Sequence, residues 1–204
     1  MKLMITSRII TGLSAALLLA FGVASCRQRS DASAVITSRS DLLNYTRPLG
    51  EIANDLDTRQ TSIVIEKSKY RLTLKYKGKL LKSYPVVFGG NPVDDKRREG
   101  DRCTPEGKFK IEARYPHRLW NKFMLLNYPT AESWRKFNEA KRSGKMRSTA
   151  TIGGSVGIHG VPERHDDAID ARNNWTLGCI SLKNSDVDEL YGAVRVGTPI
   201  EISH

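Results

Sequence analysis

The sequence predicts a β-rich α+β domain with a few short helices. Apolar and polar residues alternate in residues 61–88, which is the period-two pattern of half-buried strands. A second strand-like block follows a Pro-Glu-Gly turn at residues 105–107. Helical spacing of apolar residues occurs in two short segments, 131–144 and 184–194. This order of elements favours one β-rich domain to which short helices are added.

The strands can be placed one by one. Residues 61–66 alternate around Ile63 and Ile65, and Lys77-Gly78 supplies a hairpin turn between strands at 70–76 and 79–88. The next strand should bring Phe109 and Ile111 to one side. The closing segment "GTPIEI", residues 197–202, predicts a last strand.

Two segments carry helical signals. In the first, Trp134, Phe137 and Ala140 share one face that we expect to point at the core, and Gly144 ends the helix. In the second, Ser185 and Asp188 form a predicted capping box before three core-facing residues, which are Leu190, Tyr191 and Val194.

The N-terminus resembles the signal peptide of a bacterial lipoprotein. Lys2 and Arg8 precede an uncharged run over residues 9–25 that is short for a membrane span. The run ends in Val23-Ala24-Ser25-Cys26, a lipobox-like motif in which the cysteine is lipidated after cleavage. We therefore expect residues 1–25 to be removed and Cys26 to anchor an exported protein to a membrane surface. The alternative is an ordinary signal peptide cut nearby.

The tether follows the anchor. Residues 26–60 have little apolar periodicity and predict a linker with a short helix around 42–57, so the folded domain should occupy residues 61–204. Arg27 is not the aspartate linked to inner-membrane retention, which favours the outer membrane in a cell that has two.

The charge balance indicates an anionic partner. The formal net charge is +11, and loss of Lys2 and Arg8 with the signal leaves +9. An exported basic protein suits an envelope polymer or a lipid headgroup surface, and no basic motif with interleaved aromatics points to nucleic acid. The charged segments 94–102 and 162–170, the latter with Glu163, Asp166, Asp167 and Asp170, are predicted to be solvated loops.

Chemistry centres on Cys179 in "NNWTLGCISL", residues 173–182. A cysteine attacks acyl groups as a thiolate, so it needs a base such as histidine. Of four histidines, His159 lies in the glycine-rich segment "ATIGGSVGIHG", where glycines let a substrate approach the backbone.

Other readings of these residues remain open. Cys103 and Cys179 are able to form a disulfide outside the cytosol. Zinc bound by Cys179, His159 and His165 is a further alternative, although no close-set ligand pair supports a metal or cofactor. His159 alone is also compatible with a buried structural histidine.

The pairing of His159-Gly160 with Thr176-Leu177-Gly178-Cys179 resembles the catalytic signature of the YkuD-type L,D-transpeptidase family. The likeness also runs through "FGGNPVDDKRREGDRCTPEGKFKI", "LLNYPT" and "SLKNSDVDELYGAVRVGTPIEI", and so covers residues 61–203. It implies a β-sandwich or barrel-like catalytic domain without a cofactor. It also implies acyl transfer on peptidoglycan stem peptides.

Carried over by position, the resemblance gives each residue a role. Cys179 becomes the nucleophile and His159 the base, oriented by the Gly160 carbonyl. The N–H groups of Leu177, Gly178 and Cys179 would form the oxyanion hole. Trp175, Thr176 and Ser181 would meet the substrate, and the Thr176 hydroxyl is a candidate for fixing the turn.

Two positions depart from the family pattern. Leu177 stands where the family usually has histidine, and Ser181 stands where it usually has arginine. These departures leave open whether the acyl group passes to an amine or to water, as in a carboxypeptidase. A non-catalytic protein that binds peptidoglycan is the remaining alternative.

Overall fold

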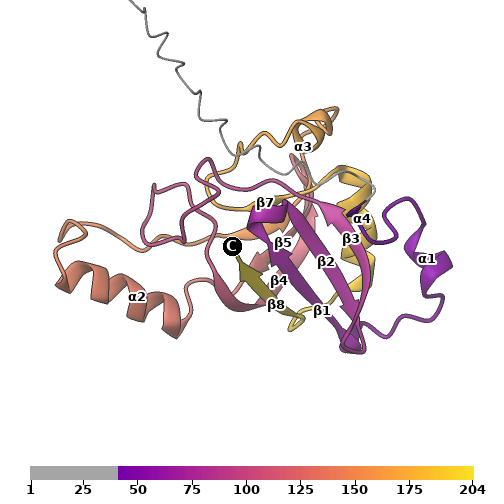
Figure 1. The fold of residues 1–204 in the computed structure, drawn as a ribbon, viewed down its shortest axis with the longest axis horizontal. Helices are drawn as coiled ribbons and strands as arrows, with labels where there is room; N and C mark the ends of the chain where they lie inside the picture. Colours follow the sequence, from indigo (N-terminus) through magenta and orange to yellow (C-terminus); the bar gives the residue numbers. More distant parts are fainter. Residues whose placement is uncertain (1–40) are drawn as a thin grey trace, which may run out of the picture. The chain divides into compact units, whose positions relative to one another are not determined.

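The computed structural model of the protein describes residues 41–204, so the predicted signal peptide, Cys26 and residues 27–40 of the tether lie outside the described residues. Eight strands form one sheet in the order β3-β2-β1-β8-β4-β5-β6-β7 (Figure 1). Their bounds are β1 (Thr61–Glu66), β2 (Arg71–Tyr76), β3 (Lys79–Pro85), β4 (Gly107–His117), β5 (Asn121–Leu126), β6 (Gly157–His159), β7 (Ile180–Ser181) and β8 (Pro199–Ser203).

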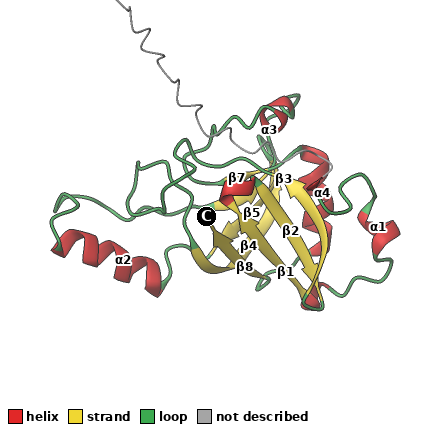
Figure 2. Cartoon of the chain, viewed as in Figure 1, coloured by secondary structure: helices red, strands yellow, loops and turns green. Residues whose placement is uncertain are grey.

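The helices are short and lie around this sheet, as Figure 2 shows by colour. They are α1 (Leu49–Ile52), η2 (Thr58–Gln60), η3 (Lys67–Lys69), α2 (Ala131–Arg142), α3 (Asp167–Asp170) and α4 (Asn184–Ala193). The β-rich α+β prediction is confirmed. No helix within residues 41–204 has the length and apolar character needed to cross a bilayer.

The first hairpin forms as the sequence predicts. Ile63 pairs with Leu74, and the core buries four side chains of the hairpin, those of Ile63, Ile65, Leu72 and Leu74. Lys77 and Gly78 have φ values of 49° and 78°, the two positive angles that a tight hairpin turn requires. Strand β3 ends at Pro85 rather than at residue 88 as predicted.

The two edges of the sheet meet. Val87, just beyond β3, exchanges backbone hydrogen bonds of 3.0 and 2.9 Å with Ser181 of β7. Thr176 N–H also donates to Phe88 O at 3.3 Å. The sheet therefore curls into a barrel-like form, as predicted, and residues 86–90 support the segment that leads to Cys179.

Strand β8 completes the core. It lies between β1, to which it is parallel, and β4, to which it is antiparallel. Ile200 and Ile202 of β8 are buried beside Phe109 and Ile111 of β4, as expected for these alternating residues. The predicted last strand thus becomes a central one.

Helix α2 matches its predicted segment but not its predicted face. Phe137 is buried, whereas Trp134 is 45% exposed, so the prediction that Trp134 faces the core is wrong. The helix projects to one side of the sheet in Figure 1 and has little core to cover. Gly144, with φ of 69°, follows its C-terminus as predicted.

The predicted capping box of α4 is wrong. The helix starts at Asn184, and Lys183 at its N-cap makes no side-chain cap. Instead, Asn184 N–H donates to Asp166 Oδ1 at 3.0 Å, and Lys183 Nζ pairs with Asp170 at 2.7 Å. Two carboxylates thus tie segment 162–170 to α4, while Glu163, Arg164 and Asp167 are exposed as predicted for a solvated loop.

Residues 41–60 pack on the domain. Leu42 and Leu49 are buried, and Tyr45 Oη donates to Asp186 of α4 at 3.1 Å. Helix α1 covers four residues of the broader helix predicted at 42–57.

The segment 94–102 is exposed at most of its positions, as predicted, but one lysine in it is buried. Lys96 is 7% exposed, because Asp101 Oδ1 and Arg98 O accept from its ammonium group at 3.0 and 3.1 Å. Nearby, the fully buried Lys67 side chain donates to Glu106 Oε1 at 2.7 Å and holds residues 93–106 against η3.

Candidate active site

A cavity of about 600 Å³ brings the predicted catalytic pair together. Its wall comes from β4, β5, β6, the segment before β6, the segment before β7 and Lys96. The lining residues are Lys96, Tyr115, His117, Trp120, Phe123, Leu125, Gly154, Ser155, Val156, His159, Trp175, Thr176, Leu177, Gly178 and Cys179. Cys179 and His159 therefore share one cavity although twenty residues separate them.

His159 is held by strand pairing and by one short hydrogen bond. It lies on β6 opposite Phe123 of β5 and Ser181 of β7, and it is 1% exposed. Its Nδ1 lies 2.6 Å from Gly160 O. Because a carbonyl only accepts, Nδ1 carries the proton and Nε2 keeps a lone pair. The imidazole is thus a neutral base whose Nε2 is free to accept a proton.

The Gly160 carbonyl has a second donor. Ser181 Oγ donates to Gly160 O at 3.2 Å, and Ser181 is fully buried. The prediction that Ser181 meets the substrate is therefore wrong, because its side chain is used inside the fold. Ser181 instead helps to fix the carbonyl that orients His159. A Cβ on Gly160 would lie 2.3 Å from Asn184 Oδ1, so only glycine fits there.

Aromatic rings enclose the imidazole. Trp120 stacks on His159 with a centroid separation of 4.6 Å, Phe123 stacks at 5.6 Å, and Trp175 meets it edge-on at 5.5 Å. Burial lowers the pKa of His159 to about 4, with nearby His117 acting in the same direction and the Gly160 hydrogen bond opposing it. His159 is therefore uncharged at neutral pH.

The turn before Cys179 is fixed by one hydroxyl. Thr176 Oγ1 donates to Cys179 O at 2.8 Å and accepts from Gly178 N–H at 3.1 Å. Gly178 has φ of 139°, and a Cβ there would lie 2.6 Å from Cys103 O. The Thr-x-Gly-Cys spacing is thus needed for a tight turn with the hydroxyl at its centre.

This turn changes the predicted oxyanion hole. The Gly178 N–H is used by Thr176, so it does not serve as a donor to substrate. The N–H groups of Leu177 and Cys179 have no acceptor among residues 41–204. Two N–H donors are therefore left for a substrate oxygen, as an oxyanion hole requires.

The Cys179 thiol rests in a neutral state. Its Sγ lies 3.6 Å from Ser155 O, which accepts the thiol hydrogen. Burial raises the pKa of Cys179, and the Gly157 amide and the Lys96 ammonium partly oppose that rise. A neutral thiol and a neutral imidazole therefore face the same cavity, so proton transfer has to accompany attack.

Trp175 and Leu177 occupy different depths of the cavity. Leu177 is 77% exposed and contributes an apolar side chain at the mouth. The Nε1 of Trp175 is buried without a hydrogen-bond partner among residues 41–204. Trp175 is thus the more deeply placed of the two side chains.

The two described cysteines differ in their surroundings. Cys103 and Cys179 are both free thiols in the structure. Cys103 is buried, and burial together with nearby Asp101 and Asp94 raises its pKa to about 11. Within residues 41–204, no three His, Cys, Asp or Glu side chains gather as a metal site needs, and the His165 ring bonds to Glu163 O at 2.8 Å.

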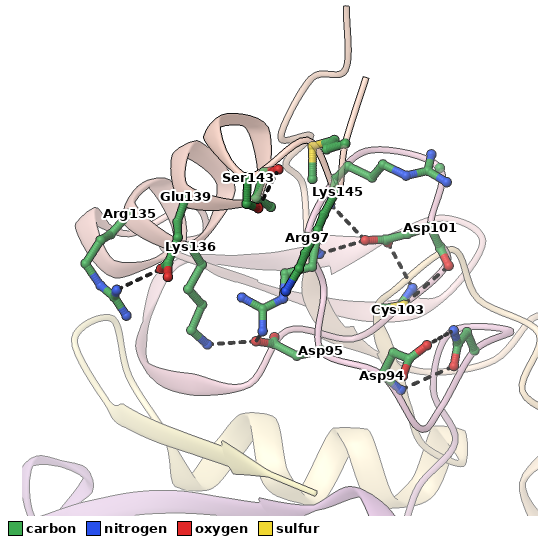
Figure 3. Close-up of a pocket in the computed structure, with 15 residues that line it drawn as sticks. Asp94, Asp95, Arg97, Asp101, Cys103, Arg135, Lys136, Glu139, Ser143 and Lys145 are labelled. Carbon is green, nitrogen blue, oxygen red and sulfur yellow. Dashed lines mark hydrogen bonds and ion pairs between the residues drawn. The ribbon is translucent and has the colours of Figure 1, made fainter. Parts of the chain in front are cut away.

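A larger cavity of about 880 Å³ lies between residues 91–103 and α2 (Figure 3). Its wall is strongly charged, but the charges pair with one another. Lys136 and Arg97 meet Asp95 at 2.7 and 3.5 Å, and Arg135 meets Glu139 at 3.1 Å. Neither Cys179 nor His159 lines this cavity, so the reactive groups belong to the smaller one.

The sequence profile of the L,D-transpeptidase catalytic domain, YkuD, matches residues 60–202. This chain belongs to that family. The YkuD match spans the whole curled sheet and includes every residue proposed above for the site. No curated protein matches the sequence.

Several solved structures are similar to this YkuD domain, and one reaches a TM-score of 0.50. The helical cell shape determining protein Pgp2 of Campylobacter jejuni has a TM-score of 0.50 at 20% identity, over 76% of this chain and 54% of that one. Bd1075 of Bdellovibrio bacteriovorus has a TM-score of 0.48 at 21% identity, over 71% of this chain and 48% of that one. L,D-transpeptidase 3 of Mycobacterium tuberculosis has a TM-score of 0.47 at 14% identity, over 71% of this chain and 60% of that one. This chain thus spans about half to three fifths of their lengths.

Three residues that line the cavity of this YkuD domain were not predicted from the sequence, namely Trp120, Phe123 and Lys96. Trp120 and Phe123 contact His159, and Lys96 lies near Gly178. The run "YPHRLWNKF", residues 115–123, has four aromatic or histidine side chains among nine residues and was the available signal. Lys96 had none, because it lies in a segment of mixed charge.

Proposed function

We propose that this protein is a cysteine acyltransferase that processes peptidoglycan stem peptides, with Cys179 as nucleophile and His159 as general base. The observation that carries the proposal is the shared cavity, which is lined by Cys179 and by an imidazole whose Nε2 has no hydrogen-bond partner among residues 41–204. The family membership supplies the substrate class.

The geometry supports a two-step reaction. His159 Nε2 takes the thiol proton as Sγ bonds to the scissile carbonyl carbon, and the carbonyl oxygen becomes an oxyanion between the N–H groups of Leu177 and Cys179. The C–N bond then breaks, and the imidazolium gives its proton to the departing amine. A thioester remains on Cys179. An acceptor amine or a water then attacks the thioester, returning its proton through His159.

Two features of the resting site suit this order. Because His159 has a pKa of about 4 and Cys179 a raised one, no thiolate–imidazolium pair is stored before substrate arrives. The Gly160 carbonyl, held by Ser181, favours the cation that His159 becomes during attack. The site therefore develops charge only when a carbonyl carbon is in place.

The test uses purified protein and defined muropeptides, with products identified by mass. Cys179→Ser and His159→Gln should each reduce turnover by about 10³-fold or more while unfolding like the parent protein. His165→Gln is the matched control, because that ring is on the surface segment and not in the cavity. Full turnover by either cavity variant contradicts the proposal and favours a binding protein.

The product distinguishes the two acyl acceptors. A new cross-link or an exchanged amino acid indicates transfer, and loss of a residue without either indicates hydrolysis by a carboxypeptidase.

We also propose that the enzyme works outside the cytosol on a lipid anchor at Cys26. The lipobox-like residues 23–26 support this location, as does the formal charge of +9 that is left after Lys2 and Arg8 are removed from the +11 of the full chain.

A further inference from the structure

One charged side chain lines the cavity of Cys179. Apart from the histidines, Lys96 is the ionisable cation among its lining residues, and the other walls are largely aromatic or aliphatic. Lys96 Nζ lies 3.8 Å from the position that a Cβ on Gly178 would occupy. Gly178 directly precedes Cys179, so the ammonium group lies beside the turn that presents the nucleophile.

The ammonium group is anchored but incompletely satisfied. Arg98 O accepts from Nζ at 3.1 Å, and Asp101 Oδ1 accepts at 3.0 Å. An ammonium has three N–H donors, and the third has no acceptor among residues 41–204. One donor of Lys96 therefore remains for a group that enters the cavity.

Asp101 does not serve Lys96 alone. Its Oδ2 accepts from the N–H groups of Arg97 and Arg98 at 2.7 and 2.8 Å, and its Oδ1 also accepts from Cys103 N–H at 3.1 Å. Because these donors share the carboxylate charge, Lys96 keeps an electrostatic effect on its surroundings. The same contacts hold the lysine in one place, which lowers the cost of using it during a reaction.

We propose that Lys96 is a catalytic residue whose ammonium group stabilises the negative charge carried first by the Cys179 thiolate and then by the oxyanion. Stabilisation of the oxyanion rests on the proposed function. Stabilisation of the thiolate does not, because the reaction of Cys179 with any alkylating reagent measures it.

The electrostatics of the thiol support this role. The Lys96 charge lowers the pKa of Cys179, against the larger effect of burial. The other titratable groups facing the cavity are His159 on β6 and Tyr115 and His117 on β4, and Asp101 lies behind Lys96. Since His159 has a pKa of about 4, Lys96 and not His159 supplies positive charge to the cavity at the pH of alkylation.

The experiment measures alkylation of Cys179 in the full chain. Rates with neutral iodoacetamide are followed from pH 6 to 11, and rates with anionic iodoacetate are compared at one pH. Peptide mass spectrometry reports Cys179 separately from Cys103. Lys96→Met is compared with Lys136→Met, because Lys136 pairs with Asp95 at 2.7 Å in the wall of the other cavity.

Loss of the ammonium should move the alkylation midpoint up by about one pH unit, which is about tenfold in thiolate at neutral pH. The preference for iodoacetate over iodoacetamide should fall several-fold, whereas Lys136→Met should leave both values unchanged. Lys96→Arg keeps the charge and should keep most of that preference. Equal midpoints and preferences in Lys96→Met and the parent protein overturn the proposal.

A measurement on the parent protein covers the case in which Lys96→Met does not fold. The iodoacetate preference of Cys179 should be several-fold higher in the native protein than in urea, and an equal preference overturns the proposal. With muropeptides, Lys96→Met should lower kcat by about tenfold or more with KM within about threefold. A raised KM with unchanged kcat instead makes Lys96 a substrate-binding residue and overturns it. Muropeptides that the parent protein leaves intact refute the proposed function while the alkylation result stands.

Discussion

Thr176 is the residue through which the turn before Cys179 is tested most directly. Thr176→Val keeps the β-branched shape and removes one hydroxyl. That hydroxyl makes two hydrogen bonds, donating to Cys179 O at 2.8 Å and accepting from Gly178 N–H at 3.1 Å. The side chain is 4% exposed, so water does not readily replace it.

The expected cost follows from these two bonds. The bond to Cys179 O contributes about 1 kcal/mol net, and a buried Gly178 N–H left without an acceptor costs about 1 to 3 kcal/mol. We expect the free energy of unfolding to fall by about 2 to 4 kcal/mol. Turnover should fall by about 10²-fold, because the freed turn no longer aims the N–H groups of Leu177 and Cys179 at one point.

Urea unfolding and muropeptide turnover measure the two effects. Thr176→Ser is the matched control, since it keeps the hydroxyl and loses one methyl, and it should retain most turnover. A Thr176→Val protein that unfolds within about 0.5 kcal/mol of the parent and turns over at its rate refutes the reasoning about the turn.

Two further outcomes are expected. The free energy of unfolding should fall by up to about 3 kcal/mol as the pH falls from 6.5 to about 4, because the unfolded chain binds a proton at His159 in this window and the folded chain does not. In urea unfolding, His159→Gln should lack this loss of stability between pH 6.5 and 4. Buried Asp186, with its pKa raised to about 6, contributes equally to both proteins. Identical pH profiles of the two proteins contradict a lowered pKa for His159. Metabolic labelling with an alkyne fatty acid should mark the parent protein and not Cys26→Ala, and equal labelling of both proteins rules out the anchor at Cys26.

Much of the fold could be predicted because it depends on local patterns. Alternation at Ile63 and Ile65 and the Lys77-Gly78 turn specify a hairpin whatever surrounds them. Failures came where distant segments decide burial. Trp134 has helical spacing, yet the sheet does not extend beneath it. The N-terminus of α4 is capped by Asp166 from another segment, which no local capping signal reveals.

The candidate site divides in the same way. Cys179 and His159 were singled out from their residue types, and their pairing and the turn at Thr176 came from the resemblance to the family signature. The hydrogen bond from Ser181 to Gly160 O could not be predicted, because it depends on the pairing of β7 with β6.

The sequence by itself determined the β-rich class, the family resemblance and the candidate catalytic pair, because these depend on short patterns along the chain. The tertiary structure decided which groups surround that pair. Curling of the sheet brings the aromatic 115–123 segment around His159 and folds residues 94–102 so that Lys96 lies beside Gly178. Burial and charge at Cys179 depend on these distant neighbours, so its reactivity follows from the closed sheet.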